Sequence, residues 1–320
     1  MTSFWDTLTR PYIVLAPMAD VTDPAFRAMF ARHGRADVMW TEFVSADGLY
    51  HTREINKIPD QDNPLLRDLA YQEGERPIVA QLFSGRPDMM EYAAGVVHEL
   101  GFDGIDINMG CPDKSVEKQG AGAALMKNVE DARALIRAAQ KGGKGLPVSV
   151  KTRVGYNAVE LETWLPELLS EHPAAITVHA RTRKEMSLVP ARWEHVARAV
   201  VLRNAINPDT KILGNGDVRT CSEARIRAAE TGADGVMIGR GIFGNPWFFT
   251  DYTPTLSEKL TALVEHCELF EQHCSHKSFS VMKKHFKAYV QGFPGASELR
   301  VMLMECSNAA DVQQCIHNWI

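Results

Sequence analysis

Residues 106–112 of the sequence, DINMGCP, bring a carboxylate, an amide and a thiol close together. Asp106 and Asn108 are separated by one residue, so on a strand both side chains project from the same face. Cys111 follows Gly110, which lets the backbone turn sharply because it has no Cβ. An isolated cysteine is more often a small buried hydrophobic residue. Its position at a turn beside polar groups reverses that expectation and makes Cys111 a candidate functional residue.

Two further segments place cations and a histidine at a similar spacing. Lys151 and Arg153 are separated by one residue, and so are His179 and Arg181. On strands, the members of each pair would lie on one face. If both strands end at one opening, two cations and a histidine–arginine pair would surround a bound molecule there. Two solvated strand ends are the alternative interpretation.

Two glycine-containing turns indicate a phosphate site. Residues 215–217, Asn-Gly-Asp, form one turn, and Gly239 and Arg240 form the other. Backbone N–H groups in such loops, with the N-terminus of a short helix expected at residues 243–248, can bind an anion. Arg240 would add a charged, forked donor. Each turn taken alone could equally be a simple chain reversal.

The elements that must position these residues alternate between strands and helices. Eight short apolar runs, most of them followed by a segment of helical periodicity, predict parallel strands with helical crossovers. The runs are residues 12–17, 36–43, 77–83, 104–108, 147–152, 175–180, 211–214 and 235–239. This pattern favours an α/β fold, a (β/α)₈ TIM barrel, over a doubly wound open sheet built from similar units. In a barrel, the segments described above follow strands, where the connecting loops converge on one mouth.

Residues with strong positional preferences support the helices between these strands. Helix starts are predicted at Asp23, Pro87, Asn128 and Thr220, and left-handed helix ends at Gly101 and Gly142.

The strand pattern ends near residues 244–246, Gly-Asn-Pro, which are residue types typical of a domain junction. Beyond it, the sequence predicts helices at residues 256–272, 279–291 and 309–319. We therefore expect two domains, a TIM-barrel domain at residues 1–245 and a small all-helical domain at residues 246–320.

Composition and charge limit the possible function. The chain has 320 residues, with 35 Lys and Arg against 40 Asp and Glu, and a net charge of −5. This charge argues against nucleic-acid binding over the whole surface, so a polyanion would have to meet a local patch. Residues 272–297 contain no acidic residue and have interleaved aromatic residues, although such a run is often only a solvated helix face. The basic residues of this segment include Lys277, Lys283, Lys284, His285 and Lys287.

Six cysteines without a CxxC pair indicate separate thiols rather than a disulfide framework or a zinc site. Cys267, Cys274 and His276 lie near one another, but their spacing fits no usual ligand pattern, which makes a zinc hydrolase the weakest hypothesis. The sequence shows no leader with a basic start and no apolar stretch of membrane-spanning length. We expect a cytoplasmic monomer that binds neither a metal nor a membrane.

Taken in order, the motifs resemble those of the tRNA-dihydrouridine synthases. They are LAPMADVTDPAFR (15–27), VAQLFS (79–84), DINMGCP (106–112), VKTRVG (150–155), VHARTR (178–183), GNGDV (214–218), IGRG (238–241) and KKHFKAYVQGFPGASELR (283–300). One such motif would be weak, whereas several ordered motifs over most of the chain make a specific signal.

The resemblance implies an FMN bound over the mouth of the barrel and a tRNA bound partly by the helical domain. The implied cofactor residues are Pro17, Met18 and Ala19 beside the flavin ring, Gln81 and Lys151 at its polar edge, His179 beside it, and Asn215, Gly216, Asp217, Gly239 and Arg240 at the ribityl chain and phosphate. The implied substrate residues are Asn108 at the uracil edge, Arg153 and Arg181 near the nucleotide, and Lys283, Lys284, His285 and Lys287 on the helical domain.

The implied reaction begins with the reduction of FMN by NADPH. Hydride then passes from flavin N5 to C6 of a uridine in tRNA, expected in the D-loop, and Cys111 protonates C5 to give 5,6-dihydrouridine. A base in folded RNA is stacked, so it would have to be flipped into the mouth.

Two other functions remain open. A free-pyrimidine reductase or dihydroorotate-type dehydrogenase would share the FMN barrel, but it has no need of the basic helix, and the sequence lacks a CxxC set for an iron–sulfur cluster. A non-catalytic RNA-binding protein on the same barrel is the second alternative. Loss of Cys111 or of the phosphate turns would have favoured it, and both are present.

Overall fold

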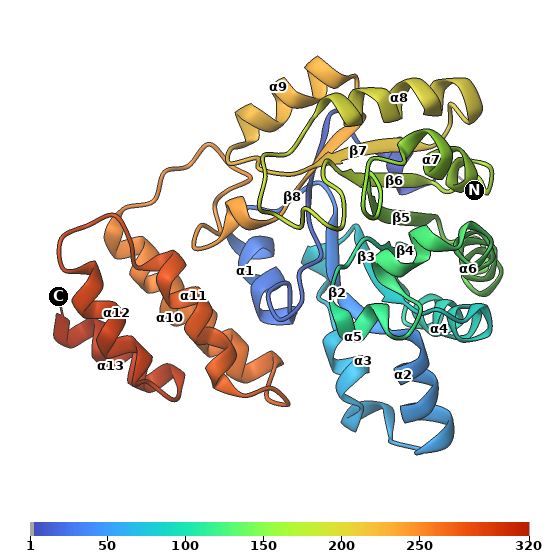
Figure 1. Ribbon diagram of the computed structural model, residues 1–320. Coiled ribbons are helices and arrows are strands. Elements are labelled where there is room, and N and C mark those ends of the chain that lie inside the picture. The colour runs from blue at the N-terminus through green and yellow to red at the C-terminus, as the bar shows by residue number, and fades with distance from the viewer. Residues whose placement is uncertain (1–2, 320) are drawn as a thin grey trace.

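In the computed structural model, which describes residues 3–319, eight parallel strands form the centre of the protein (Figure 1). The strands are β1 (Tyr12–Leu15), β2 (Met39–Ser45), β3 (Ile78–Phe83), β4 (Gly104–Met109), β5 (Val148–Arg153), β6 (Ala175–His179), β7 (Lys211–Asn215) and β8 (Gly235–Ile238). Their order in the sheet is β1-β8-β7-β6-β5-β4-β3-β2. The two ends of this order also meet, because Leu15 N–H donates to the Val38 carbonyl at 3.1 Å and Asp37 N–H donates to the Ile13 carbonyl at 3.0 Å. The sheet is therefore a closed barrel, as predicted, and not a doubly wound open sheet.

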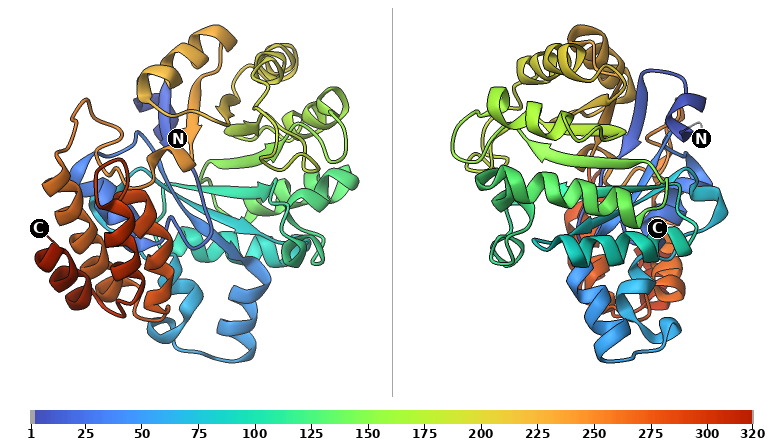
Figure 2. Two further views of the ribbon diagram at one scale, coloured as in Figure 1. Left: turned by 60° about the vertical axis from the view of Figure 1, so that its left-hand side comes forward. Right: turned by 90° about the vertical axis from the view of Figure 1, so that its right-hand side faces the viewer.

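Helices cover the outside of the barrel (Figures 1 and 2). They are α1 (Pro24–His33), α4 (Pro87–Glu99), α6 (Val129–Gly142), α7 (Leu161–Leu169), α8 (Glu194–Ile206) and α9 (Cys221–Thr231). The predicted starts are confirmed. Asp23 and Thr220 accept hydrogen bonds from the backbone N–H groups of Phe26 and Glu223, which satisfies donors that a helix leaves free. Gly101, with φ of +76°, follows α4 in the expected left-handed conformation.

The sequence places a left-handed helix end at Gly142, and this prediction is wrong. Gly142 is the last residue of α6, and Gly143 after it has a φ of −72°. A Cβ on Gly142 would lie 2.0 Å from the Glu91 carbonyl oxygen on α4. The missing side chain therefore permits the close approach of α6 to α4.

Short helical elements interrupt the alternation, and the sequence pattern does not reveal them. Between β2 and β3 the chain forms α2 (Ala46–Tyr50), a π-helical turn, η2 (His51–Ile55), and α3 (Pro64–Asp68). After β4 it forms α5 (Lys114–Glu117) and a 3₁₀ segment, η5 (Gly122–Lys127). In Figure 1, α2 and α3 project from the lower side of the barrel. These elements are too short to show a helical period in the sequence.

The C-terminal region is all-helical and lies beside α1 on one flank of the barrel (Figures 1 and 2). It contains α10 (Leu256–His273), the 3₁₀ turn η7 (Phe279–Met282), α11 (Lys283–Tyr289), α12 (Ala296–Met304) and α13 (Ala309–Trp319). The helix predicted at residues 279–291 is thus divided into η7 and α11, and α12 was not foreseen. The residues of this C-terminal region form a separate hydrophobic core, which also includes Ala25, Ala28 and Met29 of α1.

The helix predicted at residues 243–248 is absent, and a 3₁₀ turn, η6 (Arg240–Ile242), stands just before that position. Gly244 has a φ of +70°, and a Cβ there would lie 2.2 Å from the Ala288 carbonyl oxygen, so the chain bends against α11 instead of coiling. The domain boundary at residue 246 stays a prediction, since Phe248 and Phe249 still pack in the barrel core. No helix within residues 3–319 is both long and apolar enough to cross a membrane.

Candidate active site at the mouth of the barrel

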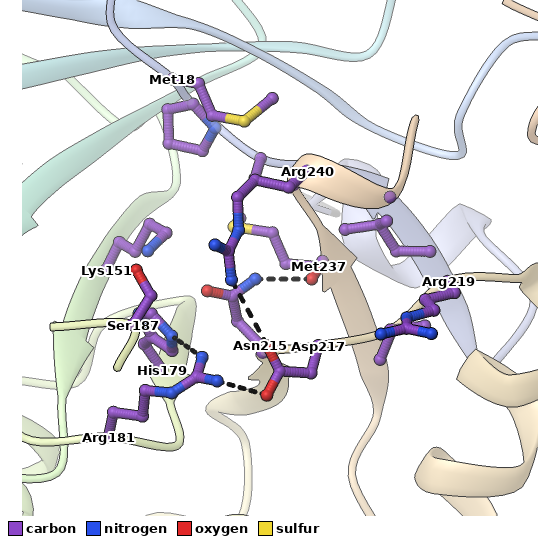
Figure 3. A pocket seen from close by; sticks show the side chains of 17 residues that line it. Met18, Lys151, His179, Arg181, Ser187, Asn215, Asp217, Arg219, Met237 and Arg240 are labelled. Carbon is purple, nitrogen blue, oxygen red and sulfur yellow. Dashed lines mark hydrogen bonds and ion pairs between the residues drawn. The ribbon is translucent and has the colours of Figure 1, made fainter. Parts of the chain in front are cut away.

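A cavity of about 480 Å³ opens at the carboxyl ends of β1, β5, β6, β7 and β8 (Figure 3). Its volume lies in the usual range of small-molecule sites, about 300–1,000 Å³. It brings together most of the residues expected to bind a cofactor: Pro17, Met18, Lys151, His179, Asn215, Gly216, Asp217, Gly239 and Arg240. Ala19 and Gln81 do not line it: Ala19 is exposed beside Met18, and Gln81 is fully buried in β3. Arg181, expected to contact substrate, lines the cavity as well.

One end of the cavity carries the charges expected of an anion site. Asp217 accepts hydrogen bonds from the guanidinium of Arg181 and from Ala191 N–H, and Arg240 approaches it at 3.4 Å. The Arg181 hydrogen bond holds the pKa of Asp217 below its usual range. Arg240 is therefore only partly neutralised by the protein, and it stays largely exposed to solvent.

Arg219 is a lining residue that the sequence reasoning missed. Within residues 3–319 its guanidinium makes no hydrogen bond or ion pair, so its donors are available to a ligand. The residue stands directly after the GNGDV motif, and this position beside a predicted phosphate turn was the available signal.

His179 and Lys151 lie next to Arg181, on the side of the cavity away from Arg219, as Figure 3 shows. Burial, reinforced by the charges of Lys151, Arg153, Arg181 and Arg240, lowers the pKa of His179 well below its usual value. The imidazole is therefore neutral. Its Nε2 lies 3.2 Å from Nη1 of Arg181, and a guanidinium can only donate, so Nε2 is the acceptor and Nδ1 carries the proton.

The ammonium of Lys151 has no hydrogen-bond or ion-pair partner in the part of the chain that the structure describes. Burial, reinforced by the charge of Arg153, lowers its pKa to about 8. An unpartnered cation in the wall of a cavity is favourable only if a polar or anionic group meets it. Lys151 thus marks where the polar edge of a ligand would lie.

Cys111 lies half-buried beside β4, packed against Phe83, Val116 and Ala121. Burial raises the pKa of its thiol, although Lys151 and Arg153 oppose the shift. The thiol is therefore protonated at neutral pH. A protonated thiol near two cations can release a proton to a substrate, because the thiolate that remains is stabilised by their charge.

Asn108 bonds to the protein itself. Its carbonyl oxygen accepts from Gly110 N–H at 3.2 Å and from Cys111 N–H at 2.9 Å, and its amide donates to Gln81 Oε1 at 3.1 Å. The side chain thus holds the turn that carries Cys111. The expected contact between Asn108 and the uracil edge stays a prediction.

Arg153 and Arg181 also direct their donors to the protein. Arg153 is buried and donates from Nε to the Gly110 carbonyl at 2.8 Å and from Nη1 to the carbonyls of Thr182 and Met186. Arg181 donates from Nε to the Val189 carbonyl at 2.6 Å. Both guanidiniums therefore fix the loop that follows β6.

The four tail residues expected to contact RNA have different environments. The expectation for His285 is wrong, because its side chain is fully buried, with ring centroids of Phe26 and His266 at 5.6 and 4.8 Å. Lys283 is half-buried and donates to the Met304 carbonyl at 2.6 Å. Lys284 and Lys287 are exposed on α11.

Lys277, another cation of the acid-free segment, is not free either. Its ammonium lies 2.6 Å from a carboxylate oxygen of Glu42 in β2 and 3.0 Å from one of Asp68 in α3. It therefore joins the helical domain to the barrel. In the described residues, no group of three His, Cys, Asp or Glu side chains could hold a metal ion.

Comparison with known proteins gives a consistent result. The family model described as "Dihydrouridine synthase (Dus)" matches residues 14–318. A protein of Staphylococcus epidermidis named "Probable tRNA-dihydrouridine synthase" is 38% identical over 319 residues, 98% of this chain and 95% of its own. "Probable tRNA-dihydrouridine synthase 2" of Bacillus subtilis is 39% identical, covering 99% of this chain and 96% of its own.

Among solved structures, histamine dehydrogenase from Rhizobium sp. 4-9 superposes with a TM-score of 0.55 and 13% identity. The match covers 83% of this chain and 51% of that one. At this identity the likeness concerns the fold alone.

Proposed function

The chain belongs to the dihydrouridine synthase family, and on that premise we propose that it reduces a uridine in tRNA to 5,6-dihydrouridine. The substrate position proposed is in the D-loop, and the protein is proposed to act as a cytoplasmic monomer. The observation that carries the proposal is the position of Cys111 just beyond the carboxyl end of β4, in a turn held by Asn108; burial raises the pKa of its thiol, which favours the protonated form.

The residues at the mouth fit FMN as the cofactor. Lys151 is an unpartnered cation suited to the polar edge of the flavin ring, and Arg219 and Arg240 are suited to its phosphate. When bound, FMN would supply the two electrons that reduce the uracil ring, with NADPH as the reductant that replenishes them. The groups proposed to hold it are Pro17, Met18, Ala19, Gln81, Lys151, His179, Asn215, Gly216, Asp217, Gly239 and Arg240.

Reduction of the C5–C6 double bond also requires a proton at C5, and Cys111 is the proposed donor. Its thiol is neutral before the reaction because burial raises its pKa. After proton transfer, Cys111 is a thiolate, and the positive charges of Lys151 and Arg153 stabilise its negative charge. Release of the proton is therefore more favourable at this position. Neutral His179 can donate from Nδ1 without adding a charge to a wall that already carries several cations.

The uridine must leave its stacked position to reach this mouth. The exposed ammonium groups of Lys284 and Lys287 are proposed to hold the RNA backbone on the helical domain. His285 takes no part in this contact.

Replacing Cys111 by Ala tests the proposal. The variant should stay yellow and keep its flavin, but dihydrouridine formation on tRNA should fall by about 10²–10⁴-fold, the usual contribution of general acid catalysis. The measurement is mass spectrometry of tRNA nucleosides after incubation with NADPH, with the flavin spectrum as control. Colourless protein, or an unchanged rate, would contradict the proposal. Equally fast reduction of free uridine would favour a free-pyrimidine reductase instead.

A further inference from the structure

We propose that Asp106 is a positioning residue for the proton donor Cys111, acting through the side chains of Gln81 and Asn108. The inference rests on the proposed function, because it assumes that Cys111 delivers the proton. It assigns Asp106 no contact with substrate or cofactor.

A continuous chain of hydrogen bonds leads from the carboxylate to the cysteine. Asp106 is fully buried, with one oxygen accepting from the Ser149 hydroxyl at 2.6 Å and the other accepting from Gln81 Nε2 at 2.6 Å. Gln81 Oε1 accepts from Asn108 Nδ2 at 3.1 Å. Asn108 Oδ1 then accepts from the backbone N–H of Cys111 at 2.9 Å.

The polarity of this chain is fixed at both ends, because the backbone N–H groups of Gly110 and Cys111 can only donate to Asn108 Oδ1 and the Asp106 carboxylate only accepts. A side-chain amide can be reversed, exchanging its donor and its acceptor, but an ionised carboxylate can only accept. Gln81 must therefore turn its NH₂ group toward Asp106 and its oxygen toward Asn108. Asn108 must in turn present its NH₂ group to Gln81, which leaves its oxygen for the N–H of Cys111. Only this arrangement satisfies every buried group in the series.

Strand register keeps the members of the chain in place. Gln81 on β3 is paired with Asp106 on β4, and Asp106 is paired with Ser149 on β5. The side chains therefore start from neighbouring backbone positions and need little freedom to meet. In contrast, Cys111 lies beyond the end of β4, where no strand pairing holds it. The Asn108 carbonyl substitutes for a strand partner at that point.

A carboxylate buried inside a barrel contributes little to stability, since a protein with an apolar residue of similar volume at that position is often equally stable or more stable. The position of Asp106 is explained if the hydrogen-bond chain to Cys111 needs a group that accepts a hydrogen bond from Gln81. Asp106 also raises the pKa of Lys151, whose own shift is dominated by burial. Burial raises the pKa of Asp106 to about 6, while hydrogen bonds from Gln81 and Ser149 and the charge of Lys151 favour its ionised form.

Three substitutions separate positioning by hydrogen-bond polarity from positioning by charge. Asp106→Leu removes the acceptor, so kcat should fall about 10- to 100-fold, the scale expected for a misplacement of about 1 Å, while KM for tRNA stays unchanged. Asp106→Asn can turn its NH₂ group toward the Ser149 hydroxyl and still accept from Gln81, so it should retain most of the activity. Ser149→Ala leaves the route to Cys111 intact and serves as the matched control, with activity near that of the unchanged protein.

The second measurement is independent of activity. Alkylation of Cys111 by iodoacetamide, followed on its peptide by mass spectrometry without tRNA, should become several-fold faster in Asp106→Leu. The Asn108 side chain then holds the Cys111 N–H less firmly, while Arg153 and Ala123 still bond the carbonyls of Gly110 and Cys111. The alkylation rate should stay unchanged in Asp106→Asn and Ser149→Ala. If Asp106→Leu does not fold, Gln81→Leu cuts the same chain one link further along and should give the same faster alkylation, a readout that does not depend on flavin binding.

The inference is overturned if folded Asp106→Leu keeps kcat within twofold and an unchanged alkylation rate, or if folded Gln81→Leu keeps an unchanged alkylation rate. A loss in Asp106→Asn as large as in Asp106→Leu would also overturn it, because charge would then be the operative property. These outcomes are distinct from failure of the proposed function, which would appear as absence of dihydrouridine formation in the unchanged protein.

Discussion

The arginines at the barrel mouth and the lysines on α11 carry the same charge but interact with different partners. Arg153 and Arg181 are buried and donate to backbone carbonyls of the protein, whereas Lys284 and Lys287 are exposed. A planar guanidinium with five donors can satisfy several carbonyls at once, so it can be buried at an acceptable cost. An ammonium on a flexible stem usually remains in water. Arg153 and Arg181 therefore hold a loop at the mouth, whereas Lys284 and Lys287 leave their charge accessible on the helical domain.

The largest expected effect is on folding, from Arg153→Leu. This change leaves the Gly110, Thr182 and Met186 carbonyls without their donor, and each buried unsatisfied acceptor costs about 1–3 kcal/mol. We expect the free energy of unfolding to fall by about 3 kcal/mol, measured by urea titration.

Arg198→Leu is the control for the loss of an arginine. Arg198 pairs with Glu162 on the surface, where both side chains are roughly half exposed, so its removal should change stability by no more than about 0.5 kcal/mol. Equal stability of the two variants, with weaker tRNA binding in Arg153→Leu, would show that Arg153 serves RNA after all.

The buried histidines of the barrel mouth and of the helical domain also differ in their hydrogen-bond partners. His179 at the mouth is bonded to Arg181, while neither ring nitrogen of His285 has a partner within the described chain. Burial lowers the pKa of His285 well below its usual value and that of nearby His266 to about 3. Because the folded-state values lie below the unfolded value of about 6.5, their stability contribution is complete above that pH and is lost as the pH falls below it.

Both histidines should destabilise the folded protein as the pH falls below 6.5; for His266, whose pKa is lowered to about 3, the loss is about 1.4 kcal/mol per pH unit, or about 2 kcal/mol at pH 5. His285→Phe, which suits the aromatic surroundings, should reduce the pH dependence of stability. The measurement is the urea midpoint of both proteins at pH 7.5 and pH 5. An identical difference between the two pH values in both proteins would show that His285 is already charged or accessible in the folded state.

The smallest effect is expected from Lys284→Ala and Lys287→Ala, about 1 kcal/mol or less in tRNA binding for each. Removal of one phosphate contact should lower the slope of log K against log salt by about 0.9, while stability changes by less than about 0.5 kcal/mol. Filter binding across a salt series measures the slope. Lys144→Ala, an exposed lysine ahead of β5 at the other end of the barrel, should leave it unchanged. If Lys284→Ala and Lys287→Ala change the slope no more than Lys144→Ala does, the proposed contact between α11 and RNA is contradicted.

Alternating periodicity predicted the strands and favoured a barrel over a doubly wound sheet, and the hydrogen bonds between the β1 and β2 segments show the closure. All eight strands were identified, because each is a short apolar run bounded by turn residues, and parallel strands fully buried by helices have that pattern. The gathering of Lys151, His179 and Asp217 around one cavity followed from the convergence of loops at the carboxyl ends of the strands. The excursion containing α2 and α3 was missed because its helices are too short to show a period.

The sequence did not predict which groups individual side chains bond to or which helical faces are buried. His285 has the sequence context of a basic patch, but whether a helical face meets α1 or water depends on tertiary packing. Arg153 stands at a strand end typical of ligand contacts, but its partners are carbonyls of loops distant in the sequence. Gly142 has the residue type of a helix end and instead permits the approach of α4. In each case the deciding neighbour is far away along the chain.

Helix α1 supplies side chains to both hydrophobic cores. Phe26 and Phe30 belong to the core of the barrel, whereas Ala25, Ala28 and Met29 belong to the core of the helical domain. The last helices of the chain therefore find one wall of their core only in a segment made near its beginning. Because a protein is synthesised from its N-terminus, that wall is made before the helices that pack against it.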